Sequence, residues 1–168
     1  MKYLIGSKLL GLTNEKDKDY VIISTEYEHK KIKENEEDIL YSSKEHLLKR
    51  FFFEDYQTKP FFYVVNYQFD KSIIGQDFPI EYNLLDYKDK LIEFLKWIVI
   101  NKRVGFLHDR INNEFCLKMT YHVAYNVFIL LNNNPIINDN QKAIIQKIHD
   151  GQMPIDYLNE LEEIILNF

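Results

Sequence analysis

The 168-residue sequence predicts an α/β (α+β) fold, in which a mixed sheet core is followed by a helical C-terminal region. Three observations support this class. Short β-branched and aromatic segments alternate with helical segments up to about residue 85. From residue 86 onwards the segments are long, amphipathic and bounded by clear stop signals. The length also suits one compact core. We therefore expect an α/β core at 1–85 and a helical region at 86–168 that packs on it.

The first two predicted strands flank a glycine-serine turn. Residues 2–5 form a short apolar run that ends at Gly6-Ser7, and residues 8–12 can form one or two helical turns. Residues 17–24 are β-branched and aromatic enough for a second strand. The N-terminal segment therefore predicts a strand, a tight turn, a short helix and a second strand.

The rest of the core is predicted from shorter signals. The charge-rich segment 26–36 is a loop or an exposed hairpin, and residues 37–41 resemble a third strand. Ser42 or Ser43 can cap a helix that runs to about residue 55. The apolar run 61–69 fits a strand or a buried helix, and we expect a strand.

The C-terminal half contains well-bounded helical segments. Asn134-Pro135 breaks one helix, Asp150-Gly151 supplies a C-terminal stop, and Pro154 opens the last segment. The expected helices are 87–102, 114–131, 139–149 and 155–166.

Composition limits the function classes. The 21 basic and 26 acidic residues give a net charge of -5, which argues against binding nucleic acid through bulk charge. A single cysteine, Cys116, cannot form an internal disulfide, so we expect a cytoplasmic protein. The most apolar stretch, 95–100, is interrupted by Lys96 and is far below the roughly 20 residues that span a bilayer. We expect no membrane association.

Two aspartates at strand spacing predict a metal site. Residues two apart on a strand point to the same face, so Asp17 and Asp19 could hold one divalent cation, Mg²⁺ or Mn²⁺. The Gly6-Ser7 turn could present N–H groups and a hydroxyl to phosphate. With Lys18 between the aspartates, the competing interpretation is an ordinary solvated turn.

Together these elements resemble the signature of the DNA polymerase β nucleotidyltransferase superfamily. That signature is an apolar strand, Gly-Gly or Gly-Ser, a gap of about ten residues, and Asp-x-Asp. The segment 6–12 (GSKLLGL) is similar to the opening of a subfamily of predicted nucleotidyltransferases that includes RNA-repair-linked proteins. The segments 118–122 (KMTYH) and 148–151 (IHDG) are similar to its C-terminal hallmark, so the resemblance covers most of the chain.

The resemblance implies transfer of a nucleoside monophosphate from a nucleoside triphosphate to a hydroxyl, with release of pyrophosphate. The acceptor is open among RNA, a protein and a small molecule. A catalytically inactive nucleotide-binding or interaction protein of the same fold is the alternative, because Lys18 and Tyr125-Asn126 depart from the subfamily pattern. Metal and catalytic roles fall to Asp17, Asp19 and Asp38, with Glu37 as the substitute for Asp38 if the register slips, and nucleotide contacts fall to Gly6, Ser7, Lys8, Lys118, Tyr121 and His122.

Other polar clusters carry less information. The basic segment 29–33 could guide RNA or could be a solvated loop. The histidines His46, His108 and His149 have no partner at zinc-ligand spacing. We therefore expect no zinc site.

Overall fold

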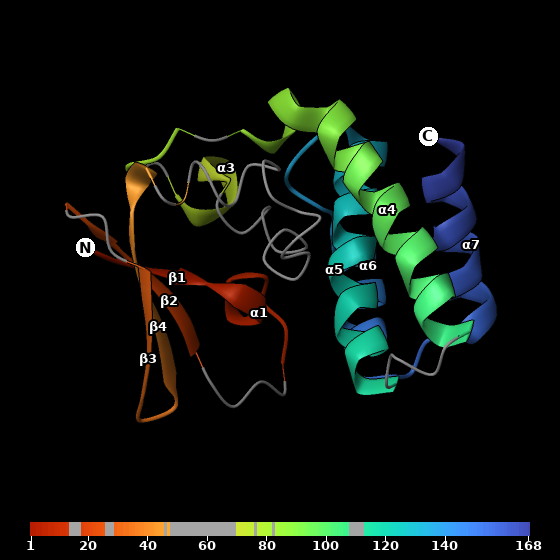
Figure 1. The fold of residues 1–168 in the computed structure, drawn as a ribbon, viewed down its shortest axis with the longest axis horizontal. Coiled ribbons are helices and arrows are strands. Elements are labelled where there is room, and N and C mark those ends of the chain that lie inside the picture. Colours follow the sequence, from red (N-terminus) through yellow and green to blue (C-terminus); the bar gives the residue numbers. More distant parts are fainter. Residues whose placement is uncertain are drawn as a thin grey trace. The chain divides into compact units, whose positions relative to one another are not determined.

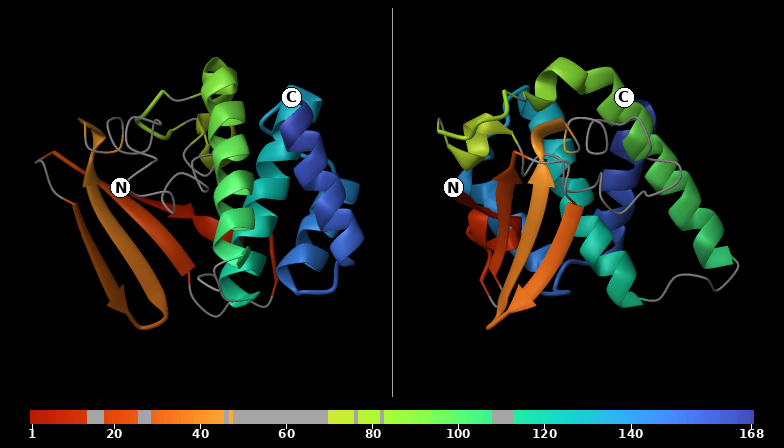
Figure 2. Two further views of the ribbon diagram at one scale, coloured as in Figure 1. Left: turned by 45° about the vertical axis from the view of Figure 1, so that its right-hand side comes forward. Right: turned by 60° about the vertical axis from the view of Figure 1, so that its left-hand side comes forward.

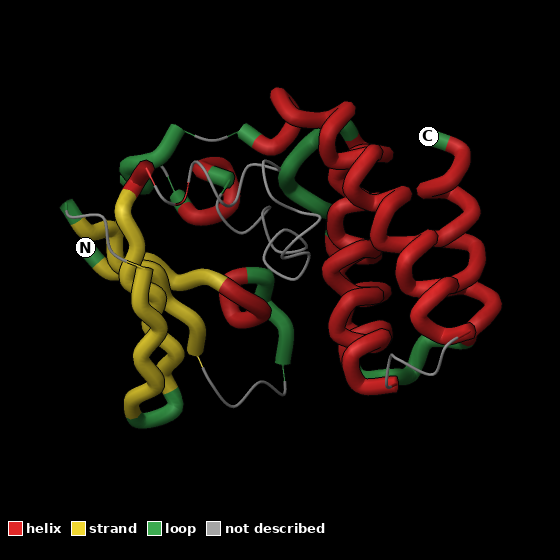
Figure 3. The backbone as a smooth tube through the Cα atoms, viewed as in Figure 1, coloured by secondary structure: helices red, strands yellow, loops and turns green. Residues whose placement is uncertain are grey.

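A mixed sheet and a set of packed helices form two separate compact units. The computed structural model of the protein describes residues 1–13, 18–25, 29–45, 47, 70–75, 77–81, 83–107 and 113–168. The units are Met1–Leu84 and Leu85–Phe168. Strands lie in the first unit and the long helices in the second, which confirms the predicted α+β class (Figures 1 and 3).

The first unit is built on a four-stranded sheet with the order β1-β2-β4-β3. β1 pairs antiparallel with β2, β2 pairs parallel with β4, and β3 pairs antiparallel with β4. Figure 2 shows the strands as one twisted sheet. The strands are β1 (Lys2–Ile5), β2 (Lys18–Ser24), β3 (His29–Glu34) and β4 (Glu37–Ser43).

A tight hairpin joins β3 to β4. Asn35 and Glu36 have φ angles of 47° and 66°. Two consecutive positive φ angles are typical of a type I′ turn, whose twist matches that of the flanking strands. Of the two alternatives for residues 26–36, the exposed hairpin is therefore the one that forms within 29–36.

The third strand is longer than predicted. β4 continues through Ser42 and Ser43, both of which are buried, and Ser43 is the register partner of Ser24 on β2. Of the two serines predicted as a helix cap, Ser43 directly precedes the helical backbone and so stands at the N-cap position, where extended backbone is usual. Helical backbone follows at Lys44. The predicted helix toward residue 55 and the strand at 61–69 lie outside the described residues, apart from the first positions of that helix.

Helix α1 (Gly6–Leu9) begins directly at the end of β1, two residues before the expected position. One face of the sheet is covered, and its buried side chains include Tyr3, Ile5 and Val21. Tyr3 packs edge-on against Phe78, with ring centroids 5.0 Å apart. Apolar burial on this face holds β1 and α1 in place.

A buried carboxylate organises the end of the first unit. Asp70 is fully buried and caps helix α3 (Lys71–Ile74), where its Oδ1 accepts a hydrogen bond of 2.8 Å from the N–H of Ser72. Its Oδ2 accepts a second, of 2.7 Å, from the N–H of Leu84. Asp70 therefore ties α3 to a segment 14 residues later.

The second unit consists of packed helices. Helix α5 contacts α4, α6 and α7, and α4 also contacts α7 (Figure 2). None of the described helices is long and apolar enough to cross a membrane. The elements are the 3₁₀ helix η3 (Leu84–Tyr87), α4 (Lys88–Leu107), α5 (Asn113–Asn132), α6 (Asp139–His149) and α7 (Ile155–Asn167).

Local end signals explain how closely these helices follow the sequence prediction. α6 begins at a capping box, in which Asn138 accepts from the N–H of Gln141 and the Gln141 side chain accepts in return. It ends before Gly151, which has φ 69°. α6 has the expected bounds. α4 lacks such a stop at Lys102 and continues five residues further than predicted, to Leu107.

Candidate functional site

The turn at Gly6 brings the chain against the carboxylate of Asp19. Gly6 has φ 78°, a left-handed conformation that glycine adopts readily. A Cβ atom at this position would lie 2.5 Å from Oδ2 of Asp19, so the approach requires glycine. Ser7 is buried, its carbonyl accepts a hydrogen bond of 3.0 Å from Leu12, and Lys8 is partly exposed. The turn therefore fixes the position of Asp19 beside the backbone.

Asp19 and Asp38 are direct register partners on the parallel strands β2 and β4. Paired residues of neighbouring strands point to the same face of a sheet, so the two carboxylates share a face. Glu37 is instead the partner of Lys18 and points to the other face, where it forms an ion pair with Lys2. The register therefore selects Asp38, not Glu37, as the acid beside Asp19.

Lysines of the edge strand β3 reach Asp38. Nζ of Lys31 lies 2.6 Å from Oδ2 of Asp38, and Nζ of Lys33 lies 3.8 Å from Oδ1. The second distance exceeds hydrogen-bond range, and Oδ1 is buried without a hydrogen-bond partner. The side chain of Asp38 is only 12% exposed. Oδ2 is thus held closely by Lys31, whereas Oδ1 has no hydrogen bond and only the more distant ammonium of Lys33.

The donor set fits a hard divalent cation. Carboxylate oxygens of Asp19 and Asp38 are the ligands that magnesium and manganese accept. The buried, unbonded Oδ1 of Asp38 and the close backbone at Gly6 are the features that fit a bound ion here. Asp17 lies outside the described residues. Among the described residues, no group of three or more His, Cys, Asp or Glu side chains could hold a metal ion.

The predicted nucleotide contacts belong to different units. Lys118, Tyr121 and His122 lie on α5 of the helical unit, whereas Gly6, Ser7 and Lys8 belong to the sheet unit. Tyr121 is buried, and its ring lies 4.0 Å from that of His122 with an angle of 31° between the planes. The structure brings Tyr121 and His122 into direct ring contact.

A third ring joins this pair. The imidazole of His149 meets Tyr121 edge-on, with centroids 5.2 Å apart. Tyr121 therefore contacts both His122 and His149. Neighbouring Asn126 is buried and donates from Nδ2 to the carbonyl of His122 at 3.0 Å, which gives this position a structural role inside α5.

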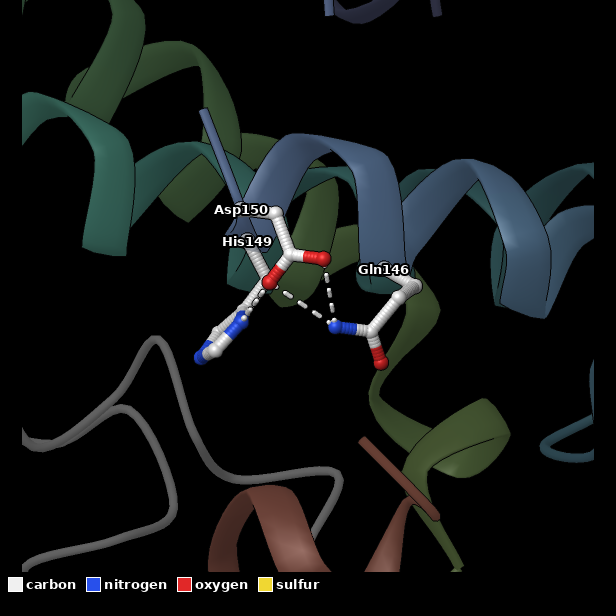
Figure 4. A network of polar contacts seen from close by, with 3 residues as sticks. All are labelled: Gln146, His149 and Asp150. Atoms are coloured by element: carbon white, nitrogen blue, oxygen red, sulfur yellow. Dashed lines mark hydrogen bonds and ion pairs between the residues drawn. The ribbon is translucent and has the colours of Figure 1, made fainter. Parts of the chain in front are cut away.

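Sequence reasoning did not predict the polar network at the end of α6. Figure 4 shows the side chains of Gln146 and His149 turned toward the carboxylate of Asp150. Nε2 of Gln146 donates to both Asp150 oxygens at 3.0 Å, and Nδ1 of His149 lies 3.1 Å from Oδ1. The i, i+4 spacing of Gln146 and Asp150 is the sequence signal for this contact. The network orients the ring that meets Tyr121.

No protein-family model, no curated protein and no solved structure matches the chain.

Proposed function

We propose that this chain is a metal-dependent nucleotidyltransferase, which moves a nucleoside monophosphate from a nucleoside triphosphate to a hydroxyl acceptor and releases pyrophosphate. The observation that carries the proposal is the pairing of Asp19 with Asp38 on one face of the sheet, beside the turn at Gly6. Two acids and a glycine turn meet there although they are separated in sequence. This arrangement agrees with the motif that the sequence resembles.

The acids would hold the metal. Asp19 and Asp38 supply oxygens from neighbouring strands, and Asp17 is the third proposed ligand from the same segment of sequence. A bound Mg²⁺ or Mn²⁺ would supply charge stabilisation at the triphosphate and lower the pKa of the attacking hydroxyl. Within the chain, Asp38 is the group proposed to accept the proton of that hydroxyl. The side chain of Asp38 is mostly buried, and the pairing of β2 with β4 puts it on the same face as Asp19.

Nucleotide contacts are assigned by the resemblance. Gly6 and Ser7 form the turn proposed to approach phosphate, and Lys8 follows them in α1. From the helical unit the resemblance assigns Lys118, Tyr121 and His122. A lysine ammonium suits phosphate, and an aromatic ring suits a base or ribose.

The acceptor is proposed only by class, as a hydroxyl carried by RNA, a protein or a small molecule. The net charge of -5 favours a local contact over an extended nucleic-acid track. The single cysteine is the reason for proposing a cytoplasmic setting.

The test is incubation of the purified chain with each α-labelled nucleoside triphosphate, with Mg²⁺ or Mn²⁺, and with candidate acceptors or a cell extract. We expect metal-dependent pyrophosphate release and one labelled acceptor. Pyrophosphate release that persists in the Asp19→Asn variant would reject the assignment of the site.

The second candidate is an inactive nucleotide-binding protein. Lys31, in direct contact with Asp38, and Lys18, between the two aspartates in sequence, favour it. It predicts nucleotide binding with no pyrophosphate release under any metal condition. The same incubation therefore separates the two candidates.

A further inference from the structure

Two lysines of β3 stand on the face of the sheet that carries Asp38. Lys33 is the register partner of Asp38 in the antiparallel β3–β4 pair. Lys31 lies two residues before it, and alternate residues of a strand share a face. Lys30 is the partner of Tyr41 and points to the opposite face. Lys31 therefore contacts Asp38, whereas its neighbour Lys30 points away from the site.

The contact at Lys31 joins an exposed ammonium to an enclosed carboxylate. Nζ of Lys31 lies 2.6 Å from Oδ2 of Asp38, whereas Lys33 remains 3.8 Å from Oδ1. The side chain of Lys31 is 61% exposed and that of Asp38 only 12% exposed. Because the lysine chain is already mostly in water, its ammonium can leave the carboxylate without a large desolvation change. The ion pair is therefore reversible.

Asp38 requires a positive partner in every state. Its register partner Asp19 lies on the same face, and two neighbouring carboxylates repel one another when neither is compensated. A buried charge without a partner is costly. A magnesium ion on Asp38 would lie roughly 2.0–2.1 Å from its oxygens. The Lys31 ammonium would then lie close enough to the magnesium ion for the two positive charges to repel one another.

We infer that Lys31 is an exchangeable counter-ion of Asp38, which neutralises the carboxylate when no divalent cation is bound and leaves Oδ2 when one binds. The inference rests on the proposed function, since it takes Asp38 as a metal ligand. Lys31 is thus a positioning residue: it stabilises Asp38 in the cation-free protein and lowers the affinity of the site for a cation.

The inference predicts two effects of opposite sign, which a merely structural lysine would not produce. Removing the charge in Lys31→Gln should lower the melting temperature of the metal-free protein. It should also tighten the binding of Mn²⁺ alone, without nucleotide, by about three- to tenfold, the size of a lost competing ion pair. Lys31→Arg keeps the charge and should bind Mn²⁺ as the wild type does.

The experiment measures free Mn²⁺ by electron paramagnetic resonance during titration of the full chain, beside thermal melts in chelator. Lys30→Gln is the matched control, because it removes the same charge from the opposite face of the same strand and should leave Mn²⁺ affinity within about twofold. Unchanged or weaker Mn²⁺ binding in Lys31→Gln, with binding still lost in Asp38→Asn, would overturn this inference and leave the proposed metal site standing. Mn²⁺ binding that survives both Asp19→Asn and Asp38→Asn would overturn both.

Discussion

The carboxylate of Asp19 lies directly over the Cα atom of Gly6, so closely that a methyl group at position 6 would come within 2.5 Å of Oδ2. The two residues are 13 positions apart in the chain, and the antiparallel pairing of β1 with β2, in which Ile5 faces Asp19, brings them together. The absence of a side chain at Gly6 therefore leaves the space that the Asp19 carboxylate occupies.

Gly6→Ala should displace Asp19 as well as strain the backbone. Gly11 is the matched control, since it has nearly the same φ, 76° against 78°, but has nothing within 4 Å of its Cβ position. We expect Gly11→Ala to cost about 1–2 kcal/mol from the left-handed backbone. Gly6→Ala should cost about 1–3 kcal/mol more from the clash and should also weaken Mn²⁺ binding. Urea unfolding and Mn²⁺ titration check this, and equal effects of the two changes would contradict it.

The register of β2 and β4 distinguishes two adjacent acids. Asp38→Asn should reduce nucleotidyl transfer about 100-fold or more, because it removes a proposed metal ligand that is also the proposed base. Glu37→Gln removes the same charge from the opposite face and should leave the rate within about twofold, with stability changed by less than about 1 kcal/mol. Pyrophosphate release per enzyme measures both. A larger loss in Glu37→Gln would reverse the assignment.

Among the described acids of the sheet unit, Asp70 is the one whose removal should lower the free energy of unfolding most. Asp70→Ala leaves the N–H groups of Ser72 and Leu84 without their acceptor and removes the cap of α3. We expect a loss of about 2–4 kcal/mol in the free energy of unfolding. Exposed Asp86 provides the comparison, since Asp86→Ala should change stability by about 0.5 kcal/mol or less. Chemical denaturation of both variants is the measurement.

The Asp150 network should stabilise the end of α6. Asp150→Ala removes the acceptor of the Gln146 amide and the partner of His149, and we expect it to cost about 1–2 kcal/mol. Gln152→Ala, at an exposed position two residues later, should be within about 0.5 kcal/mol of the wild type. If the two variants unfold at the same denaturant concentration, the network does not contribute to stability.

Tyr157 should make stability fall at alkaline pH. Burial, with the charge of nearby Glu160, raises the pKa of the Tyr157 phenol above its ordinary value of about 10. The unfolded chain therefore releases this proton first, and stability present below pH 10 decreases as the pH rises through that value toward the folded pKa. Tyr157→Phe should show a shallower decrease between about pH 9 and 11 in urea unfolding at each pH. A slope identical to that of the wild type would remove Tyr157 as a contributor.

Elements with local end signals were predicted closely. β1 and α6 have the expected bounds, because a glycine turn ends one and a capping box and Gly151 enclose the other. Elements that depend on distant partners were predicted less well. β4 is two residues longer than expected because its end pairs with β2, and the Gln146–Asp150 contact was missed.

The sequence by itself determined β1, β2, the start of β4, the glycine turn and the four C-terminal helices, and it named the candidate acids, since these follow from residue type and local spacing. Only the tertiary structure decided that Asp38 rather than Glu37 stands beside Asp19, and that Lys31 rather than Lys30 contacts it. A shift of one residue in strand pairing turns every side chain to the other face. That register is set by hydrogen bonds and burial between strands distant in the chain, and it therefore decides which side chains meet at the candidate site.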